Sequence, residues 1–317
     1  MPDNTYPEWA WKDGSFIPYK DCTVHVRTQA VMVAGSVFEG IKAFWNDSSK
    51  SLYLFRLDEH IQRLQESMKM MRMKVSVPSD LRLICVELLE RNGFTGDVHM
   101  MPTAYLDEGE GNVALARTTK EGLFITGIVR PRSAFIDKGM RACISSWRRI
   151  SDNSMPPRIK AAGNYQNGRL ALSEAWAAGY DYSILLNNAG TVSEGPGACL
   201  MMIRGGQIST PPVTAGILES ITRHTLITLF QEKFGMTVVE RLIDRTELYT
   251  AEEVFMCGTG MDVVPIISVD DITVGNGNKG PMTQAIQDAY LRVGTGEDPE
   301  HPEWRTGLRS ISDARQP

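Results

Sequence analysis

The sequence predicts a two-domain fold of the α/β or α+β class. Apolar runs of strand length alternate with segments in which apolar residues recur at helical spacing, a pattern typical of mixed enzymes rather than of bundles or sandwiches. The 317 residues, of which 42% are hydrophobic, suffice for one large core or two ordinary ones. Proline, charge and glycine interrupt the pattern at residues 130–139 (RPRSAFIDKG). We therefore expect a small N-terminal α/β domain at 1–129, a linker at 130–139 and a large C-terminal domain at 140–317.

Local patterns predict the individual elements in order. Residues 9–17 (WAWKDGSFI) are expected to form a hairpin, because Asp13-Gly14 is a turn dipeptide between strand-like residues. A helix over 58–73 is expected to begin at Asp58, a favoured N-cap residue. Asn92-Gly93 ends a second helix that starts at residue 78. Further strands are expected at 51–56, 98–105, 123–129, 141–147, 181–187, 237–242 and 253–256, and further helices near 165–179 and 219–234.

Composition and charge argue against several classes of protein. The net charge is −5 and no run is rich in lysine and arginine, so nucleic acid is not an expected partner. The longest apolar stretches have the length of strands, so no membrane span is expected. The N-terminus lacks the basic and apolar regions of a secretory signal, and the five cysteines are scattered without CxxC spacing. We expect a cytoplasmic protein with reduced thiols and, without HExxH or clustered histidines, no metal site.

One segment, residues 158–171 (RIKAAGNYQNGRLA), offers an amine beside room for a flat ring. Three small residues (Ala-Ala-Gly) follow Lys160, so a bulky group is able to approach the backbone there. Tyr165, five residues further on, is placed to hydrogen-bond an oxygen of such a ring. By itself, Lys160 is explained more simply as a solvated lysine ahead of a helix that Asn164 caps.

Three further segments offer an acid and anion-binding groups. Glu194 in TVSEGPG is suited to face a protonated ring nitrogen; alternatively it is a loop glutamate, or part of a phosphate loop that lacks the full GxGxxG. Ile221 and Thr222 open a helix whose N–H groups attract an anion, although Ser220 explains the same segment as an ordinary N-cap. Thr259 lies in a Gly-Thr-Gly segment that offers donors to an anion or simply ends a strand.

An amine, an acid for a ring nitrogen and phosphate-binding groups are together what an enzyme dependent on pyridoxal 5′-phosphate (PLP) requires. Arg63, on the helix after the strand at 51–56, is a further phosphate partner, or else an exposed helix arginine.

The order and spacing of these segments resemble the fold-type IV PLP enzymes and, among them, the branched-chain amino acid aminotransferases. The similarity covers nearly the whole chain, through GSVFEGIKAF, FRLDEHIQRL, SSW, KAAGNYQNG, VSEGPG, ILESITR, EEVFMCGTG and VGNGNKGPMT. It implies the D-amino acid/branched-chain aminotransferase-like fold, with PLP between a small and a large domain. It also implies a homodimer that completes each pocket.

The resemblance further implies roles for individual residues. Lys160 is the Schiff-base lysine and the proton shuttle, Tyr165 bonds the ring oxygen, and Glu194 pairs with the pyridine nitrogen. The groups that hold the phosphate are Arg63, Ile221, Thr222 and Thr259, and Leu218 packs under the ring. The residues of the substrate pocket are Val33, Phe38, Gly40, His99, Met101 and Gly260.

Three positions depart from the family pattern and leave the substrate open. Branched-chain aminotransferases carry Tyr-x-Arg on the strand that here reads VHMMPTAY, so His99 stands at the tyrosine and Met101 at the arginine; Val33 stands at a second tyrosine. In the family these groups bind carboxylates, and methionine replaces a charge-assisted contact with a soft apolar surface. In one interpretation, Arg130, Arg132 or Arg148 restores carboxylate binding from the linker side. Alternatively, the pocket favours a hydrophobic amino acid or an amine without a carboxylate.

The expected activity is ping-pong transamination between an amino donor, a branched-chain or other hydrophobic amino acid, and a 2-oxo acid acceptor. Alternatives on the same scaffold are a D-amino acid or (R)-amine transaminase and an aminodeoxychorismate-type lyase. A non-catalytic binding protein is the alternative of another class, and the intact lysine, glutamate and phosphate positions argue against it.

Overall fold

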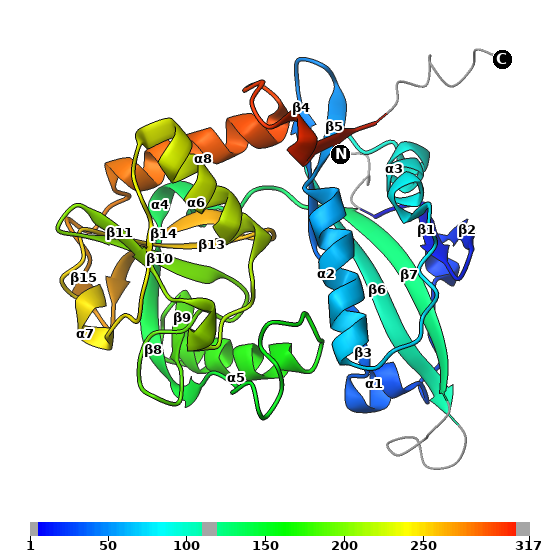
Figure 1. Cartoon of the computed structure of the whole chain (residues 1–317), viewed down its shortest axis with the longest axis horizontal. Coiled ribbons are helices and arrows are strands. Elements are labelled where there is room, and N and C mark those ends of the chain that lie inside the picture. The colour runs from blue at the N-terminus through cyan, green and yellow to red at the C-terminus, as the bar shows by residue number, and fades with distance from the viewer. Residues whose placement is uncertain (1–5, 110–118, 309–317) are drawn as a thin grey trace. The chain divides into compact units, whose positions relative to one another are not determined.

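The computed structural model describes residues 6–109 and 119–308, and the chain forms two compact units (Figure 1). The first unit comprises Met1–Pro131 with Arg292–Pro317, and the second comprises Arg132–Leu291. The structure differs here from the expected domain 140–317, because strand β16 (Arg305–Gly307) pairs with strand β5 (Ser51–Phe55) of the first unit. Pairing between strands at opposite ends of the chain leaves no local pattern in the sequence.

An eight-stranded antiparallel sheet with packed helices forms the first unit. Its remaining elements are β1 (Trp9–Lys12), β2 (Ser15–Pro18), η1 (Tyr19–Asp21), α1 (Gln29–Val33), β3 (Ser36–Phe38), β4 (Ile41–Asn46), α2 (Leu57–Met70), α3 (Leu81–Asn92), β6 (Val98–Gly109), β7 (Thr119–Val129) and η4 (Pro302–Trp304). The strand order is β16-β5-β4-β6-β7-β1-β2, and β3 pairs with β6. Helices α2 and α3 contact β3 and β7, so the face of the sheet that they cover becomes the core of this unit.

The predicted hairpin is confirmed, whereas the predicted helix start is wrong. Strands β1 and β2 pair in register, and Asp13 and Gly14 have φ values of 48° and 98°, the left-handed conformation that this tight turn requires. Helix α2 begins at Leu57 rather than at Asp58, because Arg56 (φ 51°) turns the chain directly from β5 into the helix. Asp58 lies in the first turn, where its charge still favours the helix dipole.

A mixed sheet of eight strands, with order β12-β11-β10-β13-β14-β8-β9 and β15 on β14, forms the second unit. Its elements are α4 (Phe135–Lys138), β8 (Met140–Arg148), α5 (Asn164–Ala177), β9 (Tyr182–Leu186), β10 (Cys199–Arg204), β11 (Gln207–Thr210), η3 (Val213–Ala215), α6 (Ile221–Phe234), β12 (Val239–Glu240), α7 (Arg245–Leu248), β13 (Glu253–Gly258), β14 (Asp262–Val269), β15 (Ile272–Thr273) and the helix α8 (Pro281–Thr295). The neighbouring pairs β8–β9, β8–β14 and β11–β12 are parallel.

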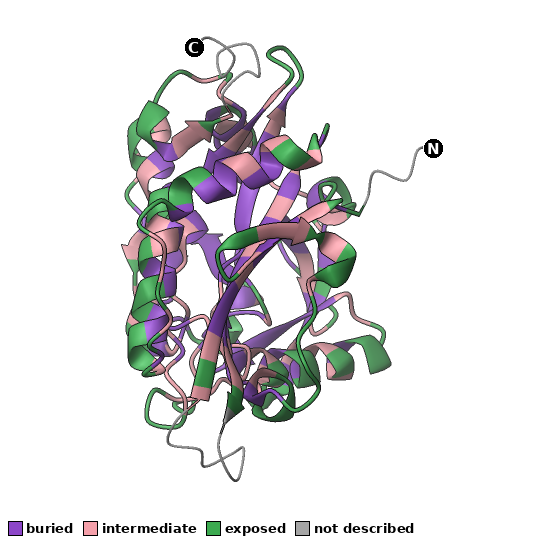
Figure 2. Ribbon diagram, turned by 90° about the vertical axis from the view of Figure 1, so that its right-hand side faces the viewer, coloured by how far each residue is buried: buried purple, intermediate pink, exposed green. Residues whose placement is uncertain are grey.

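The strands and helices predicted for the second half are all present, and several others are additional. Strands β10, β11 and β14 and helix α8 have no counterpart among the predicted elements. The expected linker 130–139 contains helix α4, which packs on β14. Strands β9 and β13 are buried along their whole length, and Figure 2 shows buried residues concentrated along the strands.

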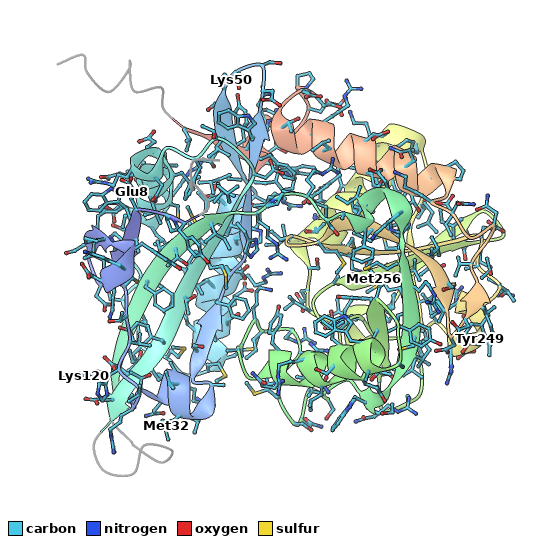
Figure 3. All side chains as sticks on the ribbon, turned by 180° about the vertical axis from the view of Figure 1, so that it is seen from behind. Glu8, Met32, Lys50, Lys120, Tyr249 and Met256 are labelled. Atoms are coloured by element: carbon cyan, nitrogen blue, oxygen red, sulfur yellow. The ribbon has the colours of Figure 1, made fainter. Side chains whose placement is uncertain are left out.

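Helices of the described ranges, 6–109 and 119–308, are too short or too polar to cross a bilayer. The side chains drawn in Figure 3 show Met256 inside the second unit, where it is fully buried on β13. In contrast, Met32 on α1 points outward and is 60% exposed.

Candidate active site

Lys160 and Tyr165 lie in hydrogen-bond contact at the start of α5. Nζ of Lys160 donates to the hydroxyl of Tyr165 across 2.5 Å. The contact arises because the residues between them form a turn, in which the N–H of Tyr165 donates to the carbonyl of Ala162. The structure therefore brings together the two side chains that the sequence predicts to act on the same ring.

Asn164 has a different role from the expected N-cap. Gly163 occupies the N-cap position of α5, and Asn164 is the first helical residue. The buried amide of Asn164 donates to the carbonyls of Pro156 and Ile159 at 2.9 and 3.2 Å. This side chain thus ties the loop before Lys160 to the helix after it, which limits where the lysine is able to move.

Glu194 is a buried carboxylate with a defined partner on each oxygen. Its Oε1 lies 2.7 Å from Nη2 of Arg149, and its Oε2 accepts the backbone N–H of Leu218 at 3.1 Å. Burial raises the pKa of Glu194 above its ordinary value, although Arg149, the Leu218 N–H and Lys160 each lower it. Lys160 and Glu194 therefore share one electrostatic environment, as the predicted roles require.

Sequence reasoning missed Arg149. Its side chain is only 10% exposed, and besides Glu194 it contacts the carbonyl of Gly216, to which Nε donates at 3.3 Å. The segment SSWRR carries two adjacent arginines, of which Arg148 is exposed and Arg149 is not. Arg149 directly follows strand β8 (Met140–Arg148), whose last three residues are all exposed, so alternation along the strand gives no sequence signal for its burial.

Thr222 and Thr259 meet at the predicted phosphate site. Their hydroxyl oxygens lie 3.4 Å apart, although 37 residues separate them. Thr222 is the second residue of α6, where backbone N–H groups have no carbonyl partner within the helix. Ser220 is indeed the N-cap of α6 and its hydroxyl accepts the N–H of Arg223, so capping leaves Ile221 and Thr222 at the anion-attracting end.

Leu218 and Gly260 flank this group. Leu218 holds Glu194 through its backbone N–H, and its carbonyl accepts a weak bond from the thiol of Cys199 at 3.7 Å. Gly260 lies in the exposed turn after β13, next to Thr259. The second unit therefore contains the predicted amine, ring acid and phosphate donors as one set.

The first unit contains a buried ionic cluster around Glu39, a residue to which the sequence prediction assigns no role. Nε and Nη2 of Arg63 donate to the two carboxylate oxygens of Glu39 at 2.6 and 2.8 Å, and Nδ1 of His60 lies 2.7 Å from Oε2. Burial raises the pKa of Glu39, but the charge and hydrogen bonds of Arg63, and after them the contact with His60, outweigh burial and hold this pKa well below its usual range. His60, Arg63 and Ser67 are buried at helical spacing on α2, and that polar stripe is the sequence signal for this cluster.

Phe38, His99 and Met101 share one face of the first sheet. Phe38 pairs with Thr103 on β6, and alternate residues of a strand point the same way, so Thr103, Met101 and His99 follow on that face. Gly40 lies against His99: a Cβ added there would approach Cε1 of His99 to 2.7 Å. Four of the predicted pocket residues are thus neighbours.

Val33 is apart from these four residues. It ends α1, is 52% exposed, and is two residues from Gly35, whose carbonyl accepts the N–H of Leu106. Leu106 and Met101 are five residues apart on β6, which corresponds to about 17 Å along an extended strand. Val33 is thus attached at the end of β6 opposite to Met101, and its place in the pocket stays a prediction.

The groups in the second unit fit a flat, phosphorylated nitrogen ring. Lys160 offers an amine, Tyr165 a hydroxyl, Glu194 a carboxylate held in a fixed place, and Thr222 with Thr259 offers paired donors at a helix N-terminus. Close backbone packing shapes the space between them, since a Cβ on Gly258 would lie 3.2 Å from the carbonyl oxygen of Gly197. This donor set is the one that PLP requires.

Comparison with known proteins gives one consistent family. Residues 36–269 match the family model of class IV amino-transferases. The chain is 36% identical over 303 residues to a probable branched-chain-amino-acid aminotransferase of Aquifex aeolicus, covering 94% of this chain and 96% of that protein. It is also 36% identical over 305 residues to the branched-chain-amino-acid aminotransferase of Escherichia coli strain K12, with coverage of 94% and 96%.

Solved structures agree with the sequence relatives. The PLP form of the branched-chain amino acid aminotransferase from Thermobaculum terrenum superposes with a TM-score of 0.92 at 38% identity, covering 96% of this chain and 100% of that chain. The branched-chain aminotransferase of the archaeon Thermoproteus uzoniensis, solved with norvaline, gives a TM-score of 0.89 at 35% identity, with coverage of 96% and 100%. The fold, the arrangement of the second unit and these relatives lead to one conclusion: the chain belongs to the class IV aminotransferases.

Proposed function

We propose that this aminotransferase uses PLP to move an amino group between a branched-chain or other hydrophobic amino acid and a 2-oxo acid. The observation that carries the proposal is the contact between Lys160 and Tyr165, in the same unit as the buried Glu194 and the Thr222–Thr259 pair. The names of its relatives, which are branched-chain aminotransferases, support the substrate class. The norvaline of the Thermoproteus uzoniensis structure, a hydrophobic amino acid, supports it as well.

In this proposal each group of the site has one task toward the cofactor. Lys160 anchors it, Tyr165 bonds its ring oxygen and Glu194 faces its ring nitrogen. The phosphate lies at the N-terminus of α6, and Leu218 packs against the ring. The phosphate donors within the second unit are Ile221, Thr222 and Thr259.

Lys160 is proposed to transfer the proton, and Glu194 to stabilise the charge on the ring nitrogen. PLP, when bound, withdraws electrons from the substrate and makes the proton on its α-carbon acidic. Nζ of Lys160 accepts that proton and later returns a proton on the product side, while the hydroxyl of Tyr165, 2.5 Å away, holds the amine in place. The ionised carboxylate of Glu194 keeps the ring nitrogen charged, which favours the electron withdrawal.

The substrate pocket is proposed to favour apolar side chains over a second carboxylate. Met101, at the position where the family pattern has arginine, shares its face with Phe38 and His99. Arg132, one of the arginines predicted to restore carboxylate binding, lies with its Nε 3.8 Å from a carboxylate oxygen of Asp262 in the second unit. The residues proposed to line this pocket are Phe38, Gly40, His99, Met101, Val33 and Gly260.

The functional form is proposed to be a homodimer in the cytoplasm. Val31, Met32 and Val33 form an exposed apolar end on α1, with exposures of 54%, 60% and 52%. Burial of this exposed apolar end against a second copy is proposed to place Val33 next to a pocket. The five cysteines are free thiols, which supports a reducing compartment.

A donor screen tests the proposed function. The PLP-loaded protein is mixed with leucine, glutamate, an aromatic amino acid or either enantiomer of 1-phenylethylamine, and conversion of the cofactor to its amino form is followed by absorbance. We expect rapid conversion with leucine and slow conversion with glutamate. Lys160→Ala should abolish both the conversion and the visible band, whereas Lys69→Ala, an exposed lysine on α2, should leave both intact.

Other outcomes assign other chemistry. Conversion by one enantiomer of 1-phenylethylamine, but by none of the amino acids, would indicate an amine transaminase. Release of pyruvate from added aminodeoxychorismate without an amino acceptor would indicate a lyase. Wild-type protein that binds PLP but reacts with no donor would end the transaminase proposal.

A further inference from the structure

Arg149 connects three segments that lie far apart in the chain. Its Nη2 forms an ion pair with Oε1 of Glu194 at 2.7 Å, and its Nε donates a hydrogen bond to the carbonyl of Gly216 at 3.3 Å. The two charged side chains are 10% and 6% exposed. The planar guanidinium uses different nitrogens for the two contacts, so one side chain fixes both partners.

The carboxylate of Glu194 is thereby held from two sides. Arg149 binds Oε1, and the N–H of Leu218, two residues beyond Gly216, binds Oε2. Rotation of the carboxylate would break at least one of these bonds. An ion pair taken out of water has a large desolvation cost, and hydrophobic residues of similar volume often serve stability as well or better. Stability alone is therefore a weak explanation for a charge at this position.

We propose that Arg149 is a positioning residue that keeps Glu194 ionised and in one orientation at the ring-nitrogen side of the cofactor site. This inference rests on the proposed function, because it assigns Glu194 to the ring nitrogen. In this assignment Arg149 acts through Glu194, which it contacts, rather than directly on substrate or cofactor.

The charges around Glu194 agree with this role. The titratable groups that face it are Arg149, Lys160, Tyr182 and Cys199. Burial raises the pKa of Glu194, and Arg149 is the strongest of the groups that oppose the rise. Burial also raises the pKa of Tyr182 and of the Cys199 thiol, so both are neutral near pH 7 and neither supplies a charge beside Glu194. Lys160 has chemistry of its own, which makes Arg149 the permanent countercharge.

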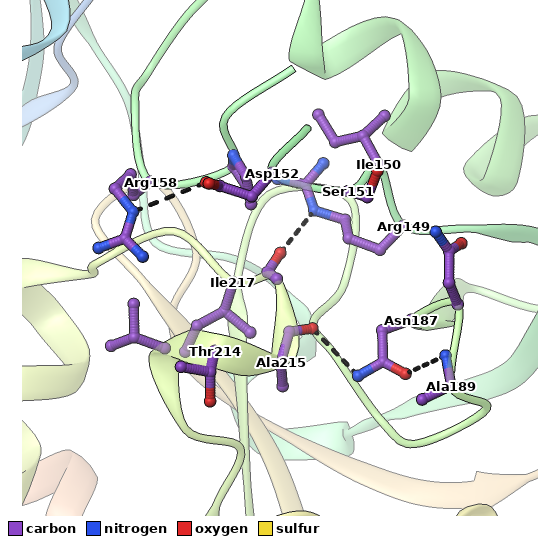
Figure 4. Close-up of a pocket in the computed structure, with 14 residues that line it drawn as sticks. Arg149, Ile150, Ser151, Asp152, Arg158, Asn187, Ala189, Thr214, Ala215 and Ile217 are labelled. Atoms are coloured by element: carbon purple, nitrogen blue, oxygen red, sulfur yellow. Dashed lines mark hydrogen bonds and ion pairs between the residues drawn. The ribbon is translucent and has the colours of Figure 1, made fainter. Parts of the chain in front are cut away.

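A cavity next to Arg149 offers a direct way to test the assignment. It has a volume of about 240 Å³ and is lined by Arg149, Ile150, Asn187, Ala215 and Ile217, among others (Figure 4). Asn187 is fixed at its wall by a bond to the carbonyl of Ala215 at 3.4 Å. Shortening Arg149 to alanine would extend this cavity toward Glu194, leaving room for a small guanidinium ion.

The test uses the full-length PLP-loaded protein and the variants Arg149→Ala, Arg149→Lys and Arg149→Ala/Glu194→Gln. Arg141→Ala is the matched control, because Arg141 lies on strand β8, which directly precedes Arg149, and forms an exposed ion pair with Asp271. We expect Arg149→Ala to bind PLP but to convert leucine about 10- to 100-fold more slowly, as when a group that orients a catalytic ligand is lost. KM for leucine should change little.

The pH dependence separates positioning from a merely structural role. Without Arg149 the carboxyl of Glu194 should ionise only at higher pH. The acidic limb of the pH–rate profile should therefore move to higher pH. The absorbance of bound PLP, titrated without substrate, should move with it. Methylguanidinium should restore part of the rate and return the limb toward its wild-type position in Arg149→Ala, but not in the double variant.

Each result decides the inference. An Arg149→Ala protein with wild-type rate, limb and absorbance titration would overturn it, and so would equal rescue in the double variant. If Arg149→Ala does not fold, Arg149→Lys is measured in its place, because a single ammonium cannot reproduce the two planar contacts of the guanidinium with Glu194 and Gly216. The acidic limb of its rate profile should move to higher pH by less than expected for alanine. An unmoved limb counts against the inference. Wild-type protein that fails to bind PLP or to react would instead overturn the proposed function.

Discussion

Glu39 and Arg63 form a two-bond ion pair inside the first unit. The bonds measure 2.6 and 2.8 Å, and the side chains are 0% and 10% exposed. Glu39 follows strand β3 and Arg63 is in the middle of α2, so the pair fastens the helix to the sheet by charge. Because Phe38 and Gly40 flank Glu39, the same contact also fixes the backbone of two proposed pocket residues.

Glu39→Gln should destabilise the protein substantially. Glutamine removes the charge of the carboxylate that accepts two bonds from the buried guanidinium of Arg63, and loss of one partner of a buried pair costs about 3–5 kcal/mol. Urea unfolding at pH 7 measures the change. Glu59→Gln, in the partly exposed pair with Arg56, should cost about 1 kcal/mol or less and serves as the control.

The effect of the same variant should depend on pH. The pKa of Glu39 is lowered in the folded protein, so its contribution to stability is complete above the unfolded pKa of about 4.3. That contribution is lost as the pH falls below this value toward the folded pKa. The difference in unfolding free energy between wild type and Glu39→Gln should therefore shrink in acid, and a constant difference would contradict the assignment.

Gly40→Ala should lower the free energy of unfolding, because the added methyl group would collide with the side chain of His99. The new Cβ would approach Cε1 and Nε2 of His99 to 2.7 and 2.9 Å, and overpacking of this kind costs about 1–3 kcal/mol. Thermal unfolding should show the loss, and the double variant Gly40→Ala/His99→Ala should recover most of it. Gly96→Ala is the control, since its Cβ would make only an ordinary contact with Val129. A failure of the double variant to recover would point to the backbone instead.

Met101→Arg should improve the use of glutamate. A guanidinium on the face of Phe38 and His99 is able to pair with a second carboxylate, and a hydrogen bond to a charged group contributes about 1.5–3 kcal/mol, or roughly tenfold and more in kcat/KM. The rate with leucine should not increase. Met70→Arg adds the same charge at an exposed position of α2 and should leave the glutamate rate unchanged. Equal kinetics in both variants would exclude Met101 from the pocket.

Thr222→Val and Thr259→Val should each weaken PLP binding. Valine keeps the shape but removes a hydroxyl from the pair that lies 3.4 Å apart at the N-terminus of α6. Loss of a hydrogen bond to a charged phosphate should raise Kd by about 10- to 100-fold. Titration of the apoprotein with PLP gives the constants. Thr228→Val, whose hydroxyl bonds the carbonyl of His224 on the same helix, should bind PLP normally.

Met32→Glu should split the proposed dimer. Burying a carboxylate without a partner is unfavourable, so a charge at the exposed end of α1 should oppose association there. Light scattering coupled to gel filtration measures the mass at several concentrations. Leu83→Glu, at a comparably exposed apolar position on α3, is the control. A Met32→Glu protein that stays dimeric would place the interface elsewhere.

Elements with strong local signals could be predicted from the sequence. The Asp13-Gly14 hairpin and the end of α3 at Gly93 follow from turn and cap chemistry, which acts within a few residues. The start of α2 could not, because Arg56 adopts a left-handed conformation that no residue pattern indicated. The edge strand β16 could not be predicted either, because its partner β5 is about 250 residues away in the sequence and the pairing has no local pattern.

The sequence by itself determined the class of protein and the chemically active groups. The order of the motifs along the chain predicted Lys160 as the amine and Tyr165 as its ring partner. The structure joins these two side chains by a hydrogen bond. Only the tertiary structure decided what surrounds the active groups. Arg149 meets Glu194, and Arg63 meets Glu39, because packed elements bring buried charges together, and such pairings depend on the burial of whole side chains rather than on spacing along the chain.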